Sequence, residues 1–388
     1  MAEVSELAQA LRTDDVSQPL LSVQDLAVTF PTDDGDVRAV RGVSFDLRPG
    51  DVLGIVGESG SGKSVSSMAI MGLLPKNARI TGSIRYRGEE LVGRSYKQLQ
   101  KFRSKHISMI FQDPMTSLNP VYTVGWQLAE AYRAHHDVSR KAAWAKAVES
   151  LELVGIPQPD RRASQYPHEF SGGMRQRVVI AMAIINDPSV IIADEPTTAL
   201  DVTVQAQILD TLLRVQQETD SAIVMITHDL GVVAGMVNRV QVMYGGTVVE
   251  SGGVDEVFEA ARMPYTIGLL GSVPNPQLLG KRLTPIKGAP PSLVNLPTGC
   301  AFSPRCPLVV DACHDGEPQL VQTDHPGHRA RCIRWEHLAG LESPQRLFAH
   351  DEIGVVEDPA SFVEVNPDVP VAQDLADVHA QDEQERTS

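Results

Sequence analysis

The segment GESGSGKS at residues 57–64 constrains the fold of this chain more than any other feature. It fits the pattern G-x-x-x-x-G-K-[ST] in full and follows an apolar run at residues 51–56. Glycines in this pattern let successive backbone N–H groups turn inward around phosphates, and a following helix adds its positive end. We expect that helix to begin near Gly62 and to end by Pro75. The segment therefore predicts a buried strand, a phosphate-binding loop and a helix, in that order.

Two residues at the end of this loop carry its expected chemistry. Lys63 would place its charge on the β- and γ-phosphates of a nucleotide, and the Ser64 hydroxyl would bind Mg²⁺. The rest of the loop would surround the phosphates with its backbone. The predicted nucleotide-binding residues of the loop are Gly57, Glu58, Ser59, Gly60, Ser61, Gly62, Lys63 and Ser64.

A second apolar strand, at residues 190–194, ends in two carboxylates, Asp194 and Glu195. Ligands bind at the carboxyl edge of an open parallel sheet. We therefore expect Asp194 to hold Mg²⁺ through water and Glu195 to act as the general base on an attacking water. An apolar strand that ends in two acids also occurs as an ordinary capped strand, but the complete phosphate loop upstream favours the catalytic interpretation.

Strand and helix patterns organise the rest of the chain. Strand patterns begin at Leu21, and a turn at residues 33–36 separates the first two. Residues 95–186 are mainly helical in pattern, most clearly at 123–136 and 139–154. Further short apolar strands are predicted at residues 107–111, 190–194, 222–227 and 239–243. Helical spacing separates the last three, which is typical of an α/β protein.

Both ends of the chain differ from the middle. Residues 1–20 are acidic and polar, which predicts a disordered leader and no secretory signal. Residues 341–388 hold 12 acidic residues and two arginines, which predicts a disordered acidic tail. That tail supplies −10 of the net charge of −15, and the −5 left on residues 1–340 argues against a nucleic-acid binder. No run of about 18 apolar residues is present, so we expect no membrane-spanning helix and a cytoplasmic protein.

All four cysteines lie within 33 residues near the end of the chain, after a segment rich in Pro and Gly at residues 273–300. In a reducing compartment this clustering favours a metal or cluster site over disulfides. The spacing C-x5-C-x6-C-x18-C lacks the C-x2-C hairpins of zinc ribbons, and four thiolates can hold a [4Fe–4S] cluster. Zinc and free cysteines are the alternatives. The residues concerned are Cys300, Cys306, Cys313 and Cys332. His314, His325 and His328 are close enough in sequence to replace a thiolate, but loop histidines are more often unliganded.

Five motifs together resemble those of ABC-transporter ATPases in order and approximate spacing. They are the phosphate loop, FQDPMTSLNP (111–120), FSGGMRQR (170–177), ADEPTTALD (193–201) and ITHDL (226–230). The match covers about residues 21–270. It implies an α/β fold with a P-loop NTPase (RecA-like) core, an antiparallel β subdomain and a helical subdomain at about residues 95–186. An irregular, cysteine-containing C-terminal lobe (271–340) would follow.

The resemblance implies further site residues. Gln112 corresponds to the glutamine that senses Mg²⁺ and the attacking water and links hydrolysis to the transmembrane subunits. His228 corresponds to the histidine on the γ-phosphate, and Asp201 to the aspartate that communicates across a dimer. Phe30 lies 27 positions before Gly57 at the end of a predicted strand. Its ring would stack on adenine, or it is an ordinary core phenylalanine.

The same resemblance implies that the chain forms a dimer with another ATPase subunit. Ser171, Gly172 and Gly173 correspond to the signature turn that touches the γ-phosphate of the ATP held by the opposing subunit. Glycines permit that close approach, and the following helix adds positive charge. The common form is LSGGQ, and Phe170 and Met174 replace its two ends here. Since the three phosphate-contacting residues are retained, no inactive site is expected.

Segments beyond the five motifs resemble the oligopeptide, dipeptide and nickel importer branch, through PYTIGLLGSVP (264–274) and PTGCAFSPRCP (297–307). The resemblance implies ATP, Mg²⁺ and a [4Fe–4S] cluster as cofactors. It implies a second ATPase subunit (identical or related), two transmembrane permease subunits and an extracytoplasmic substrate-binding protein. The chain would lie at the cytoplasmic face of the cell membrane. Peptides are the favoured cargo, with nickel or another small solute as the alternative.

Two other functions are disfavoured. Soluble ABC ATPases of DNA repair or the ribosome typically carry two cassettes or long helical inserts, whereas this chain has one cassette and no basic patch. An exporter ATPase would not be expected to carry the importer-like segments or the cysteine-containing lobe. The cargo itself is not encoded in this chain.

Overall fold

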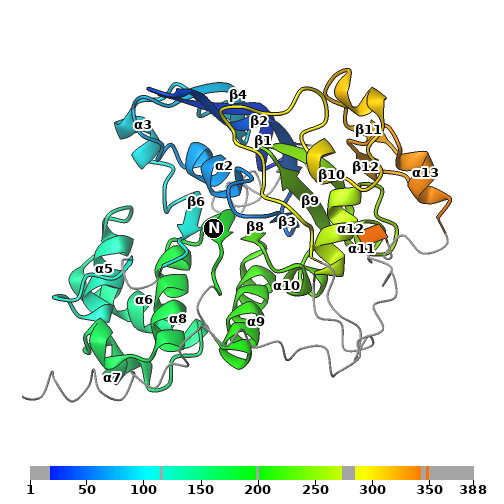
Figure 1. Cartoon of the computed structure of the whole chain (residues 1–388). Coiled ribbons are helices and arrows are strands. Elements are labelled where there is room, and N and C mark those ends of the chain that lie inside the picture. The colour runs from blue at the N-terminus through cyan, green and yellow to red at the C-terminus, as the bar shows by residue number, and fades with distance from the viewer. Residues whose placement is uncertain (1–17, 114–116, 198–200, 273–284, 342–346, 349–388) are drawn as a thin grey trace, which may run out of the picture. The chain divides into compact units, whose positions relative to one another are not determined.

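Two β-sheets form the framework of the fold (Figure 1). The computed structural model describes residues 18–113, 117–197, 201–272, 285–341 and 347–348. Within these residues the larger sheet has the strand order β11-β12-β10-β9-β3-β8-β7-β6, and the smaller sheet has the order β2-β1-β4-β5. The strands of the larger sheet are β3 (Val52–Val56), β6 (Ile107–Ile110), β7 (Val190–Asp194), β8 (Ala222–Thr227), β9 (Arg239–Tyr244), β10 (Thr247–Gly253), β11 (Val321–Gln322) and β12 (Arg329–Ala330).

The centre of the larger sheet is parallel. Strand β3 pairs in parallel with β8 and β9, and β7 pairs in parallel with β8 and β6. Every residue of β3, β7 and β8 is buried, as expected for continuous apolar strands covered on both faces. The strands predicted at 190–194 and 222–227 are confirmed, while β6 ends one residue before the predicted 107–111 and leaves Phe111 exposed.

The smaller sheet is antiparallel. It consists of β1 (Leu21–Thr32), β2 (Gly35–Leu47), β4 (Arg79–Tyr86) and β5 (Glu89–Glu90). The first two strands form the predicted hairpin, with Thr32 opposite Gly35. Leu20, inside the predicted leader, is also buried and donates its N–H to the Leu47 carbonyl at 2.7 Å. Otherwise the predicted leader and acidic tail lie almost wholly outside the described residues.

Helices cover both faces of the larger sheet. Helix α2 packs on β1, β2 and β7, so it lies between the two sheets. The predicted helices at 123–136 and 139–154 are present as α5 and α6, and Ser139 caps α6 by accepting the Ala142 N–H at 3.2 Å. The α-helices are α2 (Lys63–Ile70), α3 (Tyr96–Gln100), α5 (Val124–Arg133), α6 (Arg140–Leu153), α7 (Pro159–Ala163), α8 (Gly172–Ile184), α9 (Val202–Thr219), α10 (Leu230–Ala234), α11 (Val254–Glu259), α12 (Pro264–Gly271) and α13 (Trp335–Ala339). In the described part of the chain, none of them is both long enough and apolar enough to cross a bilayer.

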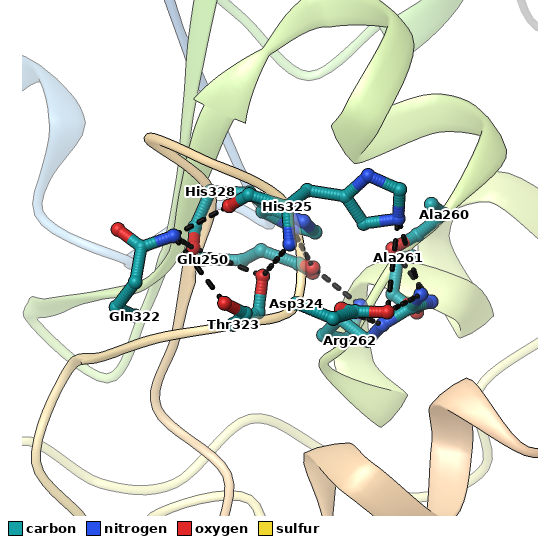
Figure 2. Close-up of polar contacts among 9 residues, drawn as sticks. All are labelled: Glu250, Ala260, Ala261, Arg262, Gln322, Thr323, Asp324, His325 and His328. Atoms are coloured by element: carbon teal, nitrogen blue, oxygen red, sulfur yellow. Dashed lines mark hydrogen bonds and ion pairs between the residues drawn. The ribbon is translucent and has the colours of Figure 1, made fainter.

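The C-terminal lobe is more regular than its composition predicts. Its strand β12 pairs with β10, where Glu250 lies opposite Ala330, and β11 pairs with β12 in turn. The 3₁₀ helices of the lobe are η3 (Ser303–Arg305) and η4 (Asp311–His314), and a further one, η1 (Pro167–Glu169), precedes α8. Figure 2 shows the polar contacts that join the lobe to the chain after β10, among them Arg262 with Asp324 at 2.8 Å. The lobe therefore extends the larger sheet.

Candidate nucleotide site and cysteine cluster

The predicted phosphate loop connects β3 to α2, and two of its glycines, Gly57 and Gly62, leave no room for a side chain. Gly62 caps α2 with φ +102°, and a Cβ there would lie 2.4 Å from the Ala39 carbonyl oxygen. A Cβ on Gly57 would lie 2.2 Å from the Met243 carbonyl oxygen. Only glycine fits backbone this close to other backbone. The loop is therefore shaped by contacts with β9 and β2, as well as by its own sequence.

Lys63 folds back into the loop. Its Nζ donates to the carbonyl oxygens of Gly57 at 2.7 Å and Glu58 at 3.0 Å. Burial lowers the pKa of Lys63, and the carboxylates of Glu195, Asp194 and Glu58 oppose that shift. The ammonium group is thus held inside the loop, where a phosphate oxygen would meet it.

Ser64 and Asp194 lie together at the carboxyl edge of the sheet. The Ser64 Oγ donates to Asp194 Oδ1 at 3.0 Å. Asp194 is 5% exposed, and burial raises its pKa. A divalent cation would favour its ionised form. A hydroxyl and a carboxylate in direct contact are suited to the ligand shell of one Mg²⁺ ion.

Glu195 lies between the other two predicted catalytic residues. Its Oε2 accepts a hydrogen bond from Gln112 Nε2 at 3.0 Å, and its Oε1 is 3.3 Å from His228 Nδ1. Its backbone has φ +48°, which is uncommon for a non-glycine residue, and its N–H donates to the Ile226 carbonyl at 2.8 Å. The turn after β7 therefore directs the carboxylate toward side chains that follow β6 and β8.

The remaining predicted residues lie on other elements. Ser171 and Gly172 are exposed at the beginning of α8, where the Ser171 Oγ accepts the Met174 N–H. Gly173 follows them, and its Cα lies against Val204 of α9. The signature turn therefore presents a helix N-terminus to solvent, where a second molecule can reach it.

Asp201 and Phe30 differ from each other in exposure. Asp201 is exposed and caps α9 by accepting the Val204 N–H at 2.9 Å. Phe30 is partly buried and packs against the core between the two sheets. Stacking on adenine and core packing therefore both stay open for this residue.

Two residues that the motifs did not single out contact the loop. The N–H of Glu58 donates to the Tyr265 hydroxyl at 2.8 Å, and the Glu58 carboxylate pairs with the Arg305 guanidinium. Both partners are more than 200 residues away in sequence. Tyr265 and Arg305 lie in the two segments that resemble the importer branch, 264–274 and 297–307, but no local pattern in this sequence indicates that they contact the loop.

The four cysteines line one small cavity together with apolar side chains such as Phe302 and Leu308. Burial raises the pKa of Cys306 to about 11 and that of Cys332 to about 12, so these thiols stay protonated at neutral pH without a cation. Four thiols in a desolvated cavity fit an iron–sulfur or zinc group as a donor set. In the described residues, however, no three His, Cys, Asp or Glu side chains are already arranged as a metal site.

The three neighbouring histidines lie elsewhere. His328 and Glu250 are both fully buried, with His328 Nε2 2.8 Å from Glu250 Oε1 (Figure 2). His325 lies beside Arg262, and His314 is exposed. The described lining of the thiol cavity includes none of them. The alternative in which a histidine replaces a thiolate therefore has no support from this lining.

Two family profiles match the chain. The family described as "ABC transporter" matches residues 40–198, which contain the phosphate loop and Glu195. The family described as "Oligopeptide/dipeptide transporter, C-terminal region" matches residues 249–313, which contain three of the four cysteines. The first match contains β3 to β7 of the core, and the second runs from β10 into the first part of the C-terminal lobe.

Relatives match over both regions. The oligopeptide transport ATP-binding protein OppD of Mycobacterium tuberculosis is 58% identical over 326 residues, which are 83% of this chain and 53% of that protein. The chain therefore spans about half the length of that relative. The dipeptide transport ATP-binding protein DppD of Bacillus subtilis is 53% identical over 320 residues, 81% of this chain and 94% of that protein. OppD of Salmonella typhimurium is 50% identical over 81% of this chain and 93% of its own length.

Solved ATP-binding cassettes share the fold. One is a dimeric cassette in a post-hydrolysis state bound to ADP and phosphate, which is 25% identical with a TM-score of 0.54 and covers 60% of this chain and 98% of its own. Another, from Clostridium perfringens, is described as part of an ABC transporter complex; it is 27% identical with a TM-score of 0.54 and covers 63% of this chain and 92% of its own. The α/β fold expected of a P-loop NTPase is thereby confirmed.

The site geometry, both profile matches and the near-complete coverage of the Bacillus relative agree. The chain belongs to the family of ATP-binding proteins of oligopeptide and dipeptide ABC transporters.

Proposed function

We propose that this chain is the ATP-hydrolysing subunit of an ABC importer for oligopeptides or dipeptides. One observation carries the ATPase assignment: the Glu195 carboxylate lies between Gln112 and His228, at the sheet edge where Asp194 contacts Ser64. A base, its two neighbours, a metal-ligand pair and a phosphate loop at one edge are the parts that phosphoryl transfer to water requires.

The proposed reaction uses each group once. The loop and Lys63 bind the β- and γ-phosphates, and Ser64 and Asp194, with Gln112, hold Mg²⁺. Glu195 accepts a proton from water as the water oxygen bonds to the γ-phosphorus and the bond to the β-bridging oxygen breaks. ADP and phosphate are released. His228 stabilises the charge that develops on the γ-phosphate.

We propose that a second ATPase subunit, identical or related, forms a dimer with this chain. Ser171, Gly172 and Gly173 would contact the γ-phosphate of the partner's ATP, and Asp201 would lie at the dimer interface. Exposure of the beginning of α8 and of Asp201 supports this assignment. So does the likeness to a solved cassette that is itself dimeric.

The cargo and the remaining partners are proposed from the names of the relatives. Those names specify oligopeptide and dipeptide transport. Two permease subunits and an extracytoplasmic substrate-binding protein would complete the importer, with this chain at the cytoplasmic face of the membrane. Nickel or another small solute is the alternative cargo. The alternative function is that of a soluble ABC ATPase outside transport.

Purification and reconstitution test this function. The tagged chain, expressed with its genomic neighbours, should copurify with two multi-spanning permeases. In proteoliposomes the binding protein loaded with peptide should stimulate ATP hydrolysis and drive peptide uptake. Stimulation by Ni²⁺ but not by peptides would move the assignment to the second cargo. Copurification with ribosomes or DNA would overturn the importer assignment.

We also propose that Cys300, Cys306, Cys313 and Cys332 hold a structural [4Fe–4S] cluster. Such a group would cross-link the C-terminal lobe and favour the thiolate forms that burial disfavours. Anaerobically purified protein should contain iron and acid-labile sulfide, and Cys332→Ser should lower both. Stoichiometric zinc without iron would assign zinc to the cavity, and no metal at all would leave four free thiols.

A further inference from the structure

One ion pair joins the C-terminal lobe directly to the phosphate loop. Arg305 Nη1 lies 2.6 Å from Glu58 Oε2, and Arg305 Nη2 lies 2.9 Å from Glu58 Oε1. The Arg305 side chain is only 5% exposed and the Glu58 side chain 25% exposed. A two-point pair of this kind fixes both position and orientation, which a single long-range charge contact does not.

Further contacts outside the phosphate loop fix the position of the Arg305 side chain. It ends η3, and its Nε donates to the Lys287 carbonyl at 3.1 Å while its Nη1 also approaches the Tyr244 hydroxyl at 3.3 Å. Its guanidinium carbon lies 5.8 Å from the centre of the Tyr244 ring and 5.9 Å from that of the Phe302 ring. These contacts place the guanidinium before any nucleotide arrives, so little freedom remains to be lost on binding.

Glu58 is contacted at three points at once. Its carboxylate meets Arg305, its N–H donates to the Tyr265 hydroxyl at 2.8 Å, and its carbonyl accepts from Lys63 Nζ at 3.0 Å. Tyr265 is fully buried and packs on Tyr244, with ring centres 4.5 Å apart. The start of the phosphate loop is thus positioned by residues that lie outside it.

The negative charge of Glu58 bears on how strongly the loop binds a nucleotide. A carboxylate in a loop that surrounds phosphates would repel them, and the repulsion is strong where water is partly excluded. The Arg305 charge offsets that carboxylate at hydrogen-bonding distance. The offsetting residue belongs to the C-terminal lobe and lies 247 positions from Glu58 in the sequence.

We infer that Arg305 is a positioning residue for the nucleotide. Through its ion pair with Glu58, the C-terminal lobe fixes the shape of the phosphate loop and neutralises a carboxylate that would otherwise repel the triphosphate. The inference rests on the proposed ATPase function, because it presupposes that the loop binds MgATP. It gives the C-terminal lobe a part in nucleotide binding that acts through Glu58.

Equilibrium binding of MgATP to the full chain tests the inference. Arg305→Ala should raise the dissociation constant of MgATP about tenfold, because the Glu58 carboxylate is then free to repel the phosphates. Arg305→Lys should lie between, because a lysine keeps the charge without the two-point geometry. Adding Glu58→Gln to Arg305→Ala should recover most of the affinity. High salt should narrow the gap between Arg305→Ala and the wild type, because it screens the repulsion.

Asp324→Asn is the matched control. Asp324 pairs with Arg262 and so also fastens the lobe (Figure 2), whereas the loop is contacted by Arg305 and Tyr265. It should leave the MgATP dissociation constant unchanged. Melting temperatures of all variants would be compared to exclude unfolding.

The outcomes separate the two proposals. If the wild type binds no MgATP, the proposed function fails and the inference fails with it. If the wild type binds MgATP and Arg305→Ala binds it equally well, only the inference fails. Equal weakening by Arg305→Ala and Asp324→Asn, or no recovery in the double variant, would also overturn it, because both results indicate general loosening of the lobe.

Discussion

Glu195 concentrates the expected chemistry in one side chain. Its carboxylate is within 3.3 Å of both a glutamine and a histidine, and its side chain is 16% exposed. Its left-handed backbone conformation persists because its N–H is bonded to Ile226 of β8. Strain of this kind is retained where the surrounding structure fixes it, as at functional sites.

Replacing Glu195 by glutamine should separate binding from hydrolysis. The amide keeps the shape of the side chain but cannot accept the proton, so MgATP binding should persist while turnover falls by about 10²-fold or more. Phosphate release and nucleotide binding would be measured on the same preparation. Glu149→Gln, which removes a carboxylate from the exposed face of α6, is the control. Near-normal turnover in Glu195→Gln would remove Glu195 as the base.

At the scale of elements, the first turn of α8 is the part that would serve a partner. Ser171→Arg should leave MgATP binding by the chain intact, because the residue caps a separate helix, and should abolish hydrolysis at the opposing site. ATP-dependent subunit association, followed by light scattering, and turnover of the assembled transporter would be measured. Ser139→Arg removes the equivalent cap from α6 and controls for lost helix stability. Equal loss in both variants would contradict a partner-facing role.

The segment between β11 and β12 should be sensitive to acid. Hydrogen bonds from Arg262 hold the pKa of Asp324 at about 2, below its ordinary value of 3.8. A lowered pKa means that the stabilisation is complete above about pH 4 and is lost as the pH falls toward 2. Asp324 is partly exposed, so the effect should be under about 1 kcal/mol. Wild type and Asp324→Asn should differ in free energy of unfolding at pH 6 and converge near pH 2, as urea titrations would show.

At the scale of the whole molecule, the lobe is tied to the core by buried polar contacts as well as by strand pairing. Glu250 of β10 and His328 of the lobe are both fully buried, and Glu250 Oε2 and His328 Nδ1 have no hydrogen-bond partner among the described residues. The His328 ring therefore depends on its contact with Glu250, whereas Glu250 Oε1 also accepts the backbone N–H of Arg262.

His328→Leu should destabilise the fold by about 2–4 kcal/mol, because it removes the side-chain partner of a buried carboxyl group and leaves it only the Arg262 N–H. Changing Glu250 to leucine as well should recover part of that loss, because the buried carboxyl group is removed, while the Arg262 N–H loses its acceptor. Urea denaturation measures both values, and His325→Leu, on a more exposed side chain, should have little effect. A double variant no more stable than His328→Leu would contradict this account of the attachment.

The sequence by itself determined the parts that depend on local pattern. Glycine spacing predicts the phosphate loop, and continuous apolar runs predict the parallel strands. Strand and helix patterns predict the hairpin from Leu21 and the helices α5 and α6. These signals are contained in a few neighbouring residues. Strands β4, β5, β10, β11 and β12 were not predicted. Strand β4 is half-exposed, β10 ends in Ser-Gly-Gly, and the other three have two residues each.

Only the tertiary structure decided which distant residues meet. The sheet order brings Gln112 and His228 to Glu195, and the return of the chain after α12 brings Arg305 to Glu58 across 247 positions. A local pattern reports which face of an element is buried, but not which element lies against it. Contacts between elements far apart in sequence arise from packing the whole core, so they become visible only once the chain is folded.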